Sequence, residues 1–316
     1  MNMNRVNEPV FLIGAERSGT TLLRLMLDHH PEIAFNLESE YLVSQIAENG
    51  VFPDIGHYAD WLRRNRVFRH SRFGIDERLD YAGLVNDFLR QKLERDGKKH
   101  VGATVHYRFG KLALIWPDAK YIYLYRDGRD VAGSVVQMGW AGNAFIAADW
   151  WLEAEKEWED FRPRLAGDRW LEVRYENLIT DPRGELERIC GFFGVGFSER
   201  MFDYTGTSSY GLPDPSLIYQ WRRKMKPQDL RLAEARLAKR LRERGYEMSG
   251  LPLKTIGPLG GGILRLHSRL ARLRRRISDF GLSLYLQEML SRRLRLRRWN
   301  RAVQTRIDTI VDAGIR

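Results

Sequence analysis

The chain contains 316 residues, 43% of them hydrophobic, and carries a formal net charge of +11. This length can bury a full core, and the single cysteine, Cys190, excludes an internal disulfide framework and a thiolate metal cluster. Residues 251–316 hold 15 of the 52 basic and four of the 41 acidic residues, which leaves 37 of each sign in residues 1–250. The larger part is neutral overall, so we expect no nucleic-acid partner.

The first apolar run, Val10–Ile13, is too short for a secretory signal or a membrane span, and we expect a soluble, cytoplasmic protein. The run predicts a strand buried on both faces of a parallel sheet. Gly14 and Gly19 follow in a loop, and from Thr20 the apolar residues fall at helical spacing. A strand, loop and helix in this order direct backbone N–H groups at one point, as in phosphate and sulfate sites.

The spacing of Gly14 and Gly19 matches the start of a nucleoside-triphosphate loop, but Thr20 stands where such a loop has lysine. A kinase or ATPase is therefore disfavoured. Positive charge and hydroxyl donors come instead from four neighbouring residues, Arg17, Ser18, Thr20 and Thr21. The alternative is a tight strand-to-helix turn in another kind of α/β protein.

Further strands and helices are expected along the chain. Residues 32–36 read as a short strand with Glu38 just past its end, where ligands bind in an open α/β sheet. Residues 40–97 look helical, residues 100–104 predict a strand, and residues 109–116 predict a helix that Pro117 stops.

A second strand, loop and helix follows at residues 121–137. Arg126 ends the aromatic strand, and Ser134 lies eight residues on, two turns into the helix. One guanidinium and one hydroxyl could hold a second phosphate. The alternative is that the charged residues of this turn only pair with one another; these are Arg126, Asp127, Arg129 and Asp130.

Three segments resemble landmarks of the sulfotransferase family, whose members move a sulfuryl group from 3′-phosphoadenosine 5′-phosphosulfate (PAPS) to an acceptor. Residues 17–21, followed by Leu27–Pro31, resemble its 5′-phosphosulfate loop, and residues 125–131 with Ser134 resemble its 3′-phosphate loop. Residues 170–178 are similar to its Arg-Tyr-Glu-Asp-Leu stretch. The resemblance covers about residues 8 to 248, and its motifs are closest to bacterial members and tyrosylprotein-type sulfotransferases.

The resemblance implies an α/β fold with a P-loop-like parallel sheet flanked by helices. It implies PAPS as donor, 3′-phosphoadenosine 5′-phosphate (PAP) as product and no metal. The acceptor would be a hydroxyl on a carbohydrate, lipid, small metabolite or peptide. The donor-binding residues that it implies are Arg17, Ser18, Gly19, Thr20, Thr21, Arg126, Ser134, Tyr175, Ser208, Trp221 and Arg222, with Ser209 as a further candidate. For Ser208, Ser209, Trp221 and Arg222, ordinary solvated loop residues are the alternative.

Glu38 matches the catalytic glutamate of tyrosylprotein-type relatives, and we predict that it is the base; Glu40 is the neighbour most easily confused with it. A helix-capping acid is the alternative. Many relatives carry a lysine that contacts the leaving group, and the corresponding segment here, residues 102–106, has none. Arg17 would take over the bridging oxygen with help from Thr104 or His106, or His106 is itself the base. A core or surface histidine is the other interpretation.

Several other residues are assigned to the core. The aromatic residues of a long helix at 144–165 and Cys190, in a helix at 186–193, are expected to be buried. Residues 204–216 read as a loop, and residues 230–246 as the last helix of a sulfotransferase domain, residues 1–250.

Residues 251–316 predict a basic amphipathic helical extension that begins with a flexible joint at Pro252, Pro258 and Gly260–Gly262. Such a helix can lie on an anionic membrane, pack on a partner or a second copy, or remain solvated.

The resemblance to the sulfotransferase family therefore predicts in-line sulfuryl transfer from PAPS. A nucleotide-binding scaffold of the same fold without turnover is the alternative, which the missing lysine suggests.

Overall fold

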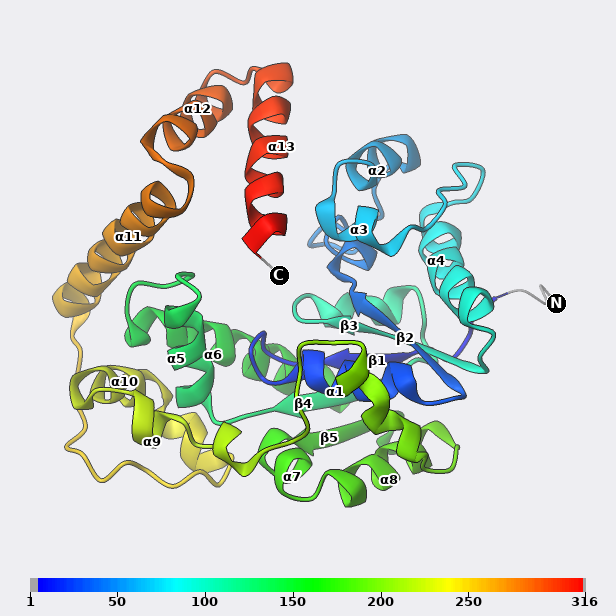
Figure 1. The fold of residues 1–316 in the computed structure, drawn as a ribbon, viewed down its shortest axis with the longest axis horizontal. Coiled ribbons are helices and arrows are strands. Elements are labelled where there is room, and N and C mark those ends of the chain that lie inside the picture. The colour runs from blue at the N-terminus through cyan, green and yellow to red at the C-terminus, as the bar shows by residue number, and fades with distance from the viewer. Residues whose placement is uncertain (1–4, 315–316) are drawn as a thin grey trace.

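A computed structural model describes residues 5–314. Its centre is a five-stranded parallel sheet in the order β2-β3-β1-β4-β5 (Figure 1). The strands are β1 (Val10–Ile13), β2 (Ile33–Glu38), β3 (His100–Val105), β4 (Lys120–Tyr125) and β5 (Trp170–Arg174). All strands run the same way, so their carboxyl ends meet at one edge of the sheet. The predicted α/β fold with a parallel sheet is confirmed.

The central strand shows why the sheet forms. Every side chain of β1 is buried, with Phe11 and Ile13 in one apolar cluster and Val10 and Leu12 in another. Alternate residues of a strand point to opposite faces, so each face of the sheet carries its own core. Such a doubly covered strand is uniformly apolar, as the sequence predicted.

One face is covered by α2 (Ile55–Leu62), α3 (Arg66–Ser71) and α4 (Tyr81–Asp96). Residues 40–97 are therefore three helices and a 3₁₀ turn at Glu40–Leu42 rather than one helical stretch. The reason is local: Asp54, Asn65 and Asp80 each accept a backbone N–H and start a new helix. Residues 109–114 form a 3₁₀ helix, where we had expected a helix to residue 116.

The other face is covered by α1 (Thr20–His29), α7 (Tyr175–Thr180) and α8 (Pro182–Phe193). Cys190 is fully buried in α8, in contact with Met201, which confirms the expected core position. Glu199–Gly206 is a 3₁₀ helix against α1, in part of the stretch that the sequence predicted to be a loop.

A third cluster joins α5 (Gly128–Gln137), α6 (Ala144–Phe161) and α10 (Pro227–Glu243), with α9 (Trp221–Lys224) beside α5. Trp151, Trp158 and Phe161 of α6 are buried, as expected, whereas Trp150 is only partly buried. Arg129 is buried with them and bridges two acids, Asp127 and Glu234.

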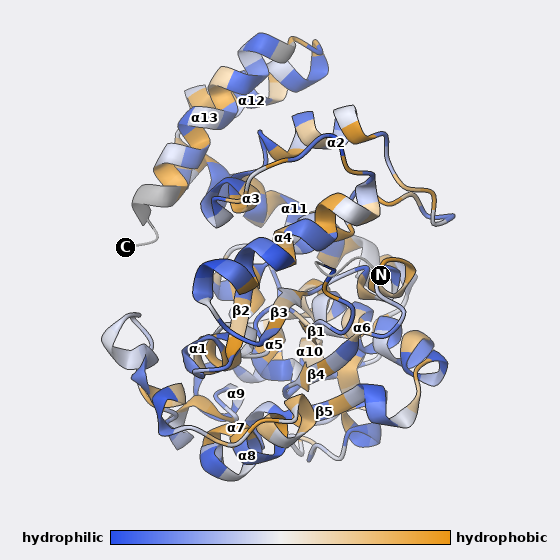
Figure 2. Cartoon of the chain, turned by 90° about the vertical axis from the view of Figure 1, so that its right-hand side faces the viewer, coloured by the Kyte–Doolittle hydropathy of each residue, from blue (hydrophilic) through white to orange (hydrophobic). Residues whose placement is uncertain are grey.

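The basic extension forms an arch of α11 (Pro258–Phe280), α12 (Leu282–Arg293) and α13 (Arg297–Gly314) (Figures 1 and 2). At one end of the arch, α11 packs on α6 and on the loop before α6. At the other end, Asp308 Oδ2 of α13 forms an ion pair with Arg69 Nη2 of α3 at 3.2 Å. Gly260–Gly262 lie inside α11, not in the flexible joint that we expected, because α11 already begins at Pro258.

The boundary at residue 250 stays a prediction, and the last two residues of the predicted extension lie outside the described part. Within residues 5–314, no helix has the length and apolar character to cross a bilayer.

Candidate active site

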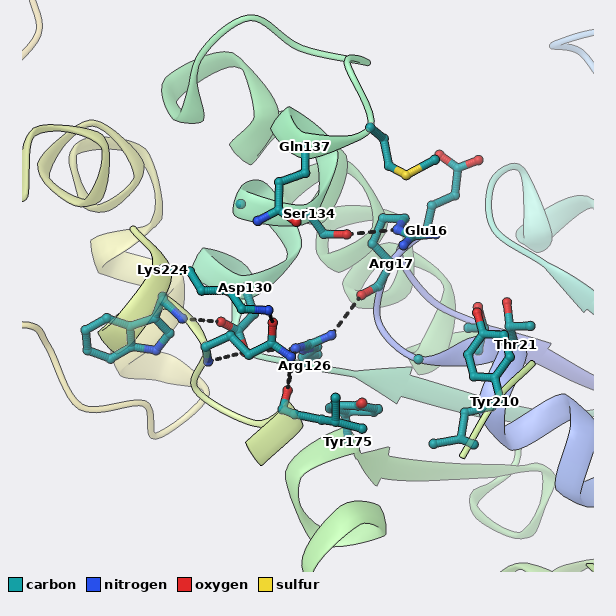
Figure 3. Close-up of a pocket in the computed structure, with 18 of the residues that line it drawn as sticks. Glu16, Arg17, Thr21, Arg126, Asp130, Ser134, Gln137, Tyr175, Tyr210 and Lys224 are labelled. Carbon is teal, nitrogen blue, oxygen red and sulfur yellow. Dashed lines mark hydrogen bonds and ion pairs between the residues drawn. The ribbon is translucent and has the colours of Figure 1, made fainter. Parts of the chain in front are cut away.

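A cavity of about 890 Å³ opens at the carboxyl edge of the sheet (Figure 3). Its walls come from segments far apart in the sequence: the loop after β1, the ends of β2 and β3, the start of α5, and residues 209–225. Parallel strands bring these segments together, and ligands of α/β proteins bind at this edge.

The loop after β1 adopts a backbone conformation that requires glycine at two positions. Gly14 has φ 145° and Gly19 has φ 98°, and a Cβ at Gly19 would overlap the ring of Tyr175. Arg17 also adopts a positive φ, 71°. The loop leads directly into α1, so the first N–H groups of a ten-residue helix face the cavity edge.

Ser18 is fully buried in this loop, and its hydroxyl has no hydrogen-bond partner within residues 5–314. A buried unsatisfied hydroxyl destabilises a fold unless something else bonds to it. An anion in the loop would provide that acceptor. Thr20 and Thr21 line the cavity, and Thr20 is itself hydrogen-bonded to His106.

Arg126 follows β4, the neighbour of β1 in the sheet, and lies in the cavity beside the first loop (Figure 3). Its Nη2 donates to Asp130 at 3.0 Å and to the carbonyl of Leu217 at 2.8 Å. Its Nη1 makes only a 3.5 Å contact, to the carbonyl of Arg17, and its Nε has no partner among the described residues. The guanidinium therefore keeps donors for another anion.

The two loops meet within the cavity. Arg17 Nε donates to Ser134 Oγ at 2.9 Å, which links the loop after β1 to α5 (Figure 3). The ring of Tyr175 lies under Arg126, with 4.4 Å from the guanidinium carbon to the ring centroid. The candidates from all three sequence landmarks are thus brought into one site.

The charges around Arg126 do pair, as the alternative interpretation of this turn supposed, and they form a scaffold. Asp130 accepts the backbone N–H of Trp221 at 2.7 Å, and Asp127 accepts Trp221 Nε1 at 3.0 Å. Burial raises the pKa of Asp130, and Arg126 opposes this change. These bonds hold Trp221 at the cavity while the guanidinium retains its other donors.

The segment after residue 204 is placed differently from our prediction. Trp221 lines the cavity, but Arg222 is exposed and pairs with Glu247, and Ser208 lies outside the lining. Ser209 does contribute to the wall. Within this segment, the basic residue that lines the cavity is Lys224, three residues after Trp221 on α9.

Glu38 and Glu40 have different surroundings, although they are two residues apart. Glu38 is exposed at the end of β2 and lines the cavity. Glu40 accepts from His106 Nδ1 at 2.7 Å and from the backbone N–H of His106 at 3.2 Å. The other ring nitrogen of His106 lies 3.0 Å from Thr20 Oγ1. Glu40, His106 and Thr20 therefore form a hydrogen-bonded row that ends at the first loop.

The electrostatics of this row favour a charged imidazole. Burial acts to lower the pKa of His106, but the hydrogen bond and the charge of Glu40 outweigh it, and the net shift is upward. Burial raises the pKa of Glu16, the neighbour of Arg17, although His106 opposes this change. His106, buried and with a raised pKa, thus lies beside the first loop, hydrogen-bonded to Thr20.

The sequence analysis missed several polar and charged residues of the cavity lining, among them Glu16, Gln137 and Lys224. Glu16 accepts a hydrogen bond from Trp150 Nε1 at 3.0 Å. Spacing could have found two of them. Gln137 follows Ser134, and Lys224 follows Trp221, by three residues, which places each pair on one face of a helix.

Comparison with known proteins adds a family. Residues 9–199 match the model of the sulfotransferase family. A putative protein-tyrosine sulfotransferase of Caenorhabditis briggsae is 24% identical over 212 residues, which cover 64% of this chain and 71% of that protein. Protein-tyrosine sulfotransferase A of Caenorhabditis elegans is 24% identical over 214 residues, 64% of this chain and 53% of that protein. The chain thus spans about half the length of the second relative.

Two solved structures share the fold. The sulfotransferase domain of the Synechococcus PCC 7002 olefin synthase has a TM-score of 0.57 at 23% identity, covering 80% of this chain and 98% of that domain. The sulfotransferase domain of the curacin biosynthetic pathway has a TM-score of 0.54 at 18% identity, covering 77% and 99%. At these identities the likeness establishes the fold.

Proposed function

Because the chain belongs to the sulfotransferase family, we propose that it transfers a sulfuryl group from PAPS to a hydroxyl acceptor in the cytoplasm. One observation carries this proposal: the loop after β1 and the Arg126–Ser134 segment line a single cavity and are joined by the Arg17–Ser134 hydrogen bond. A donor with phosphate groups at both the 3′ and the 5′ position of its ribose needs two groups of anion-binding residues that face one cavity.

The residues present fit that donor. For the 5′-phosphosulfate, the first loop offers N–H groups and Arg17 from the cavity lining, and the unpaired hydroxyl of Ser18, which is buried in the same loop outside that lining. Arg126 offers Nε and Nη1 for the 3′-phosphate, and Ser134 offers its hydroxyl. Tyr175 and Trp221 supply aromatic walls.

The proposed reaction forms a bond between the acceptor oxygen and sulfur and breaks the bond from sulfur to the 5′-phosphate oxygen, which leaves PAP. Glu38 takes the acceptor proton, because it is exposed to the cavity while Glu40 is bonded to His106. His106, held positive by Glu40, and Arg17 lie at the loop and stabilise the negative charge that develops on the leaving oxygen. In this scheme His106 replaces the family lysine and is not the base.

The similar proteins suggest which acceptor should be tested first. Because similar proteins are protein-tyrosine sulfotransferases, a tyrosine peptide is the first acceptor to test. Carbohydrate, lipid and small-metabolite hydroxyls complete the panel.

The test combines transfer and binding. The purified chain is incubated with ³⁵S-labelled PAPS and the acceptor panel, and PAP binding is followed by calorimetry. We expect Glu38→Gln to abolish most transfer but to keep PAP affinity. Glu32→Gln is the matched control. Glu32 lies directly before β2, at the end of the strand opposite to Glu38, and forms an ion pair with Lys99. PAP binding without transfer to any acceptor would support the scaffold instead, and no PAP binding would refute the donor site.

A further inference from the structure

Helix α11 carries a row of exposed apolar residues that no part of the described chain covers. Leu259, Ile263, Leu266 and Leu270 have exposed fractions of 87%, 69%, 59% and 47%. They follow one another at intervals of four, three and four residues, the spacing of one helical face. We call these four residues the outer row.

The outer row faces away from the sulfotransferase fold. Gly261 and Ser268 are buried, and Ser268 Oγ accepts a hydrogen bond from the backbone N–H of Gly142, in the loop before α6, at 2.9 Å. Each residue of the outer row lies two positions in sequence from Gly261 or Ser268. Two residues correspond to a rotation of about 200° around an α-helix of about 3.6 residues per turn, so the outer row is on the side opposite to the buried face. In Figure 1 α11 stands at the outer margin of the molecule.

Positive charge flanks the row on both sides. By the same helical geometry, Arg269 lies on one flank and Arg274 on the other. Both are exposed, and neither forms an ion pair within residues 5–314. Asp279 is the single acid in the sequence of α11, and Arg275 binds it at 2.8 Å. The face therefore combines apolar side chains with unneutralised cations.

Helix α12 repeats this pattern. Leu284, Glu288 and Ser291 are buried, whereas Leu282, Leu286 and Met289 are exposed at 55%, 40% and 40%. The apolar exposure is thus not confined to one helix of the arch.

We propose that the outer row of α11 docks on an anionic phospholipid surface. Apolar side chains between arginines match an interface where acyl chains lie below negative headgroups. A second copy of this chain fits the charge less well, since pairing two outer rows would bring the Arg269 and Arg274 side chains of both copies together with no acid between them. Charge complementarity thus selects the lipid surface.

The experiment uses the full chain in cosedimentation with vesicles. We expect binding to phosphatidylcholine vesicles that contain phosphatidylserine, weaker binding to phosphatidylcholine alone, and loss of binding as salt rises. The double variant Ile263→Gln/Leu266→Gln should bind the anionic vesicles at least roughly tenfold more weakly, since it removes two apolar side chains from the interface. Arg269→Ala/Arg274→Ala should lose the preference for anionic vesicles.

Leu114→Gln is the control, because Leu114 is 53% exposed in a 3₁₀ helix outside the arch. It should bind vesicles as the parent chain does, and all variants should melt at the parent temperature and keep PAP affinity. Sedimentation velocity provides the second measurement. A dimer that the double variant dissolves, without vesicle binding, would assign the outer row to self-association and overturn the proposal. A monomer that binds no vesicle would overturn it equally.

Discussion

Replacing Arg126 by glutamine tests the donor site most directly. The variant keeps a polar side chain but loses the charge and the donors at Nε and Nη1 that the protein leaves unused. Asp130 would lose its partner at 3.0 Å but would keep the backbone N–H groups of Trp221 at 2.7 Å and Gln220 at 3.2 Å. We therefore expect the fold to survive and the anion site to fail.

The magnitude follows from the number of bonds at stake. A hydrogen bond to a charged group contributes about 1.5–3 kcal/mol, and about 1.4 kcal/mol corresponds to a factor of ten in affinity. Losing one such bond should raise the Kd of PAP by roughly tenfold to a hundredfold, and losing both should raise it further. Adenosine 5′-phosphate lacks the 3′-phosphate, so its affinity should change little.

Isothermal titration calorimetry with both nucleotides measures these effects. Arg174→Gln is the matched control: Arg174 ends the neighbouring strand β5, stacks on Tyr246 at 4.2 Å and lies outside the cavity lining. The reasoning is refuted if Arg126→Gln binds PAP as the parent chain does, or if Arg174→Gln loses as much affinity. Equal losses for both nucleotides would place Arg126 elsewhere than at the 3′-phosphate.

Three further predictions follow from contacts in and around the site. Gly19→Ala should lower the melting temperature and weaken PAP binding at least tenfold, because its φ is 98° and its Cβ would overlap Tyr175; calorimetry and thermal melting check this. Glu40→Gln should lower the pKa of His106, so the alkaline limb of the kcat/KM profile moves to lower pH. Because the folded pKa of His106 is raised, the stability that this pair contributes is full below the unfolded pKa and disappears as pH rises through the folded pKa; the parent and Glu40→Gln should therefore differ most in acid, as urea unfolding across pH will show. Arg129→Met should cost about 3–5 kcal/mol in urea unfolding, since it leaves two buried carboxylates, Asp127 and Glu234, without their cationic partner; a cost below about 1 kcal/mol would contradict this.

The strands and the two loops that follow β1 and β4 could be predicted because each depends on a short run of residues. Val10–Ile13 is apolar at every position, and the glycines that follow it leave few backbone alternatives. Arg126 could be found because a strand end and a following helix fix where its side chain starts. Local sequence is sufficient for features of this kind.

Other features depend on contacts between distant segments. The hydrogen bond between His106 and Glu40 joins the segments that follow β3 and β2. It engages Glu40, whereas Glu38 lines the cavity, and the sequence alone could not distinguish the roles of these two neighbouring glutamates. The placement of Lys224 instead of Arg222 in the cavity depends on which face of α9 packs inward. The contact of α13 with α3 depends on the path of the whole arch.

That last contact has a consequence for biosynthesis. Arg69 and Asp308 are separated by 239 positions, whereas the cavity wall is complete by residue 225. A chain made from its N-terminus forms its earlier parts first. The segments that line the cavity can therefore assemble on the ribosome before α13 is translated, and the contact of α13 with α3 forms only after that helix has been made.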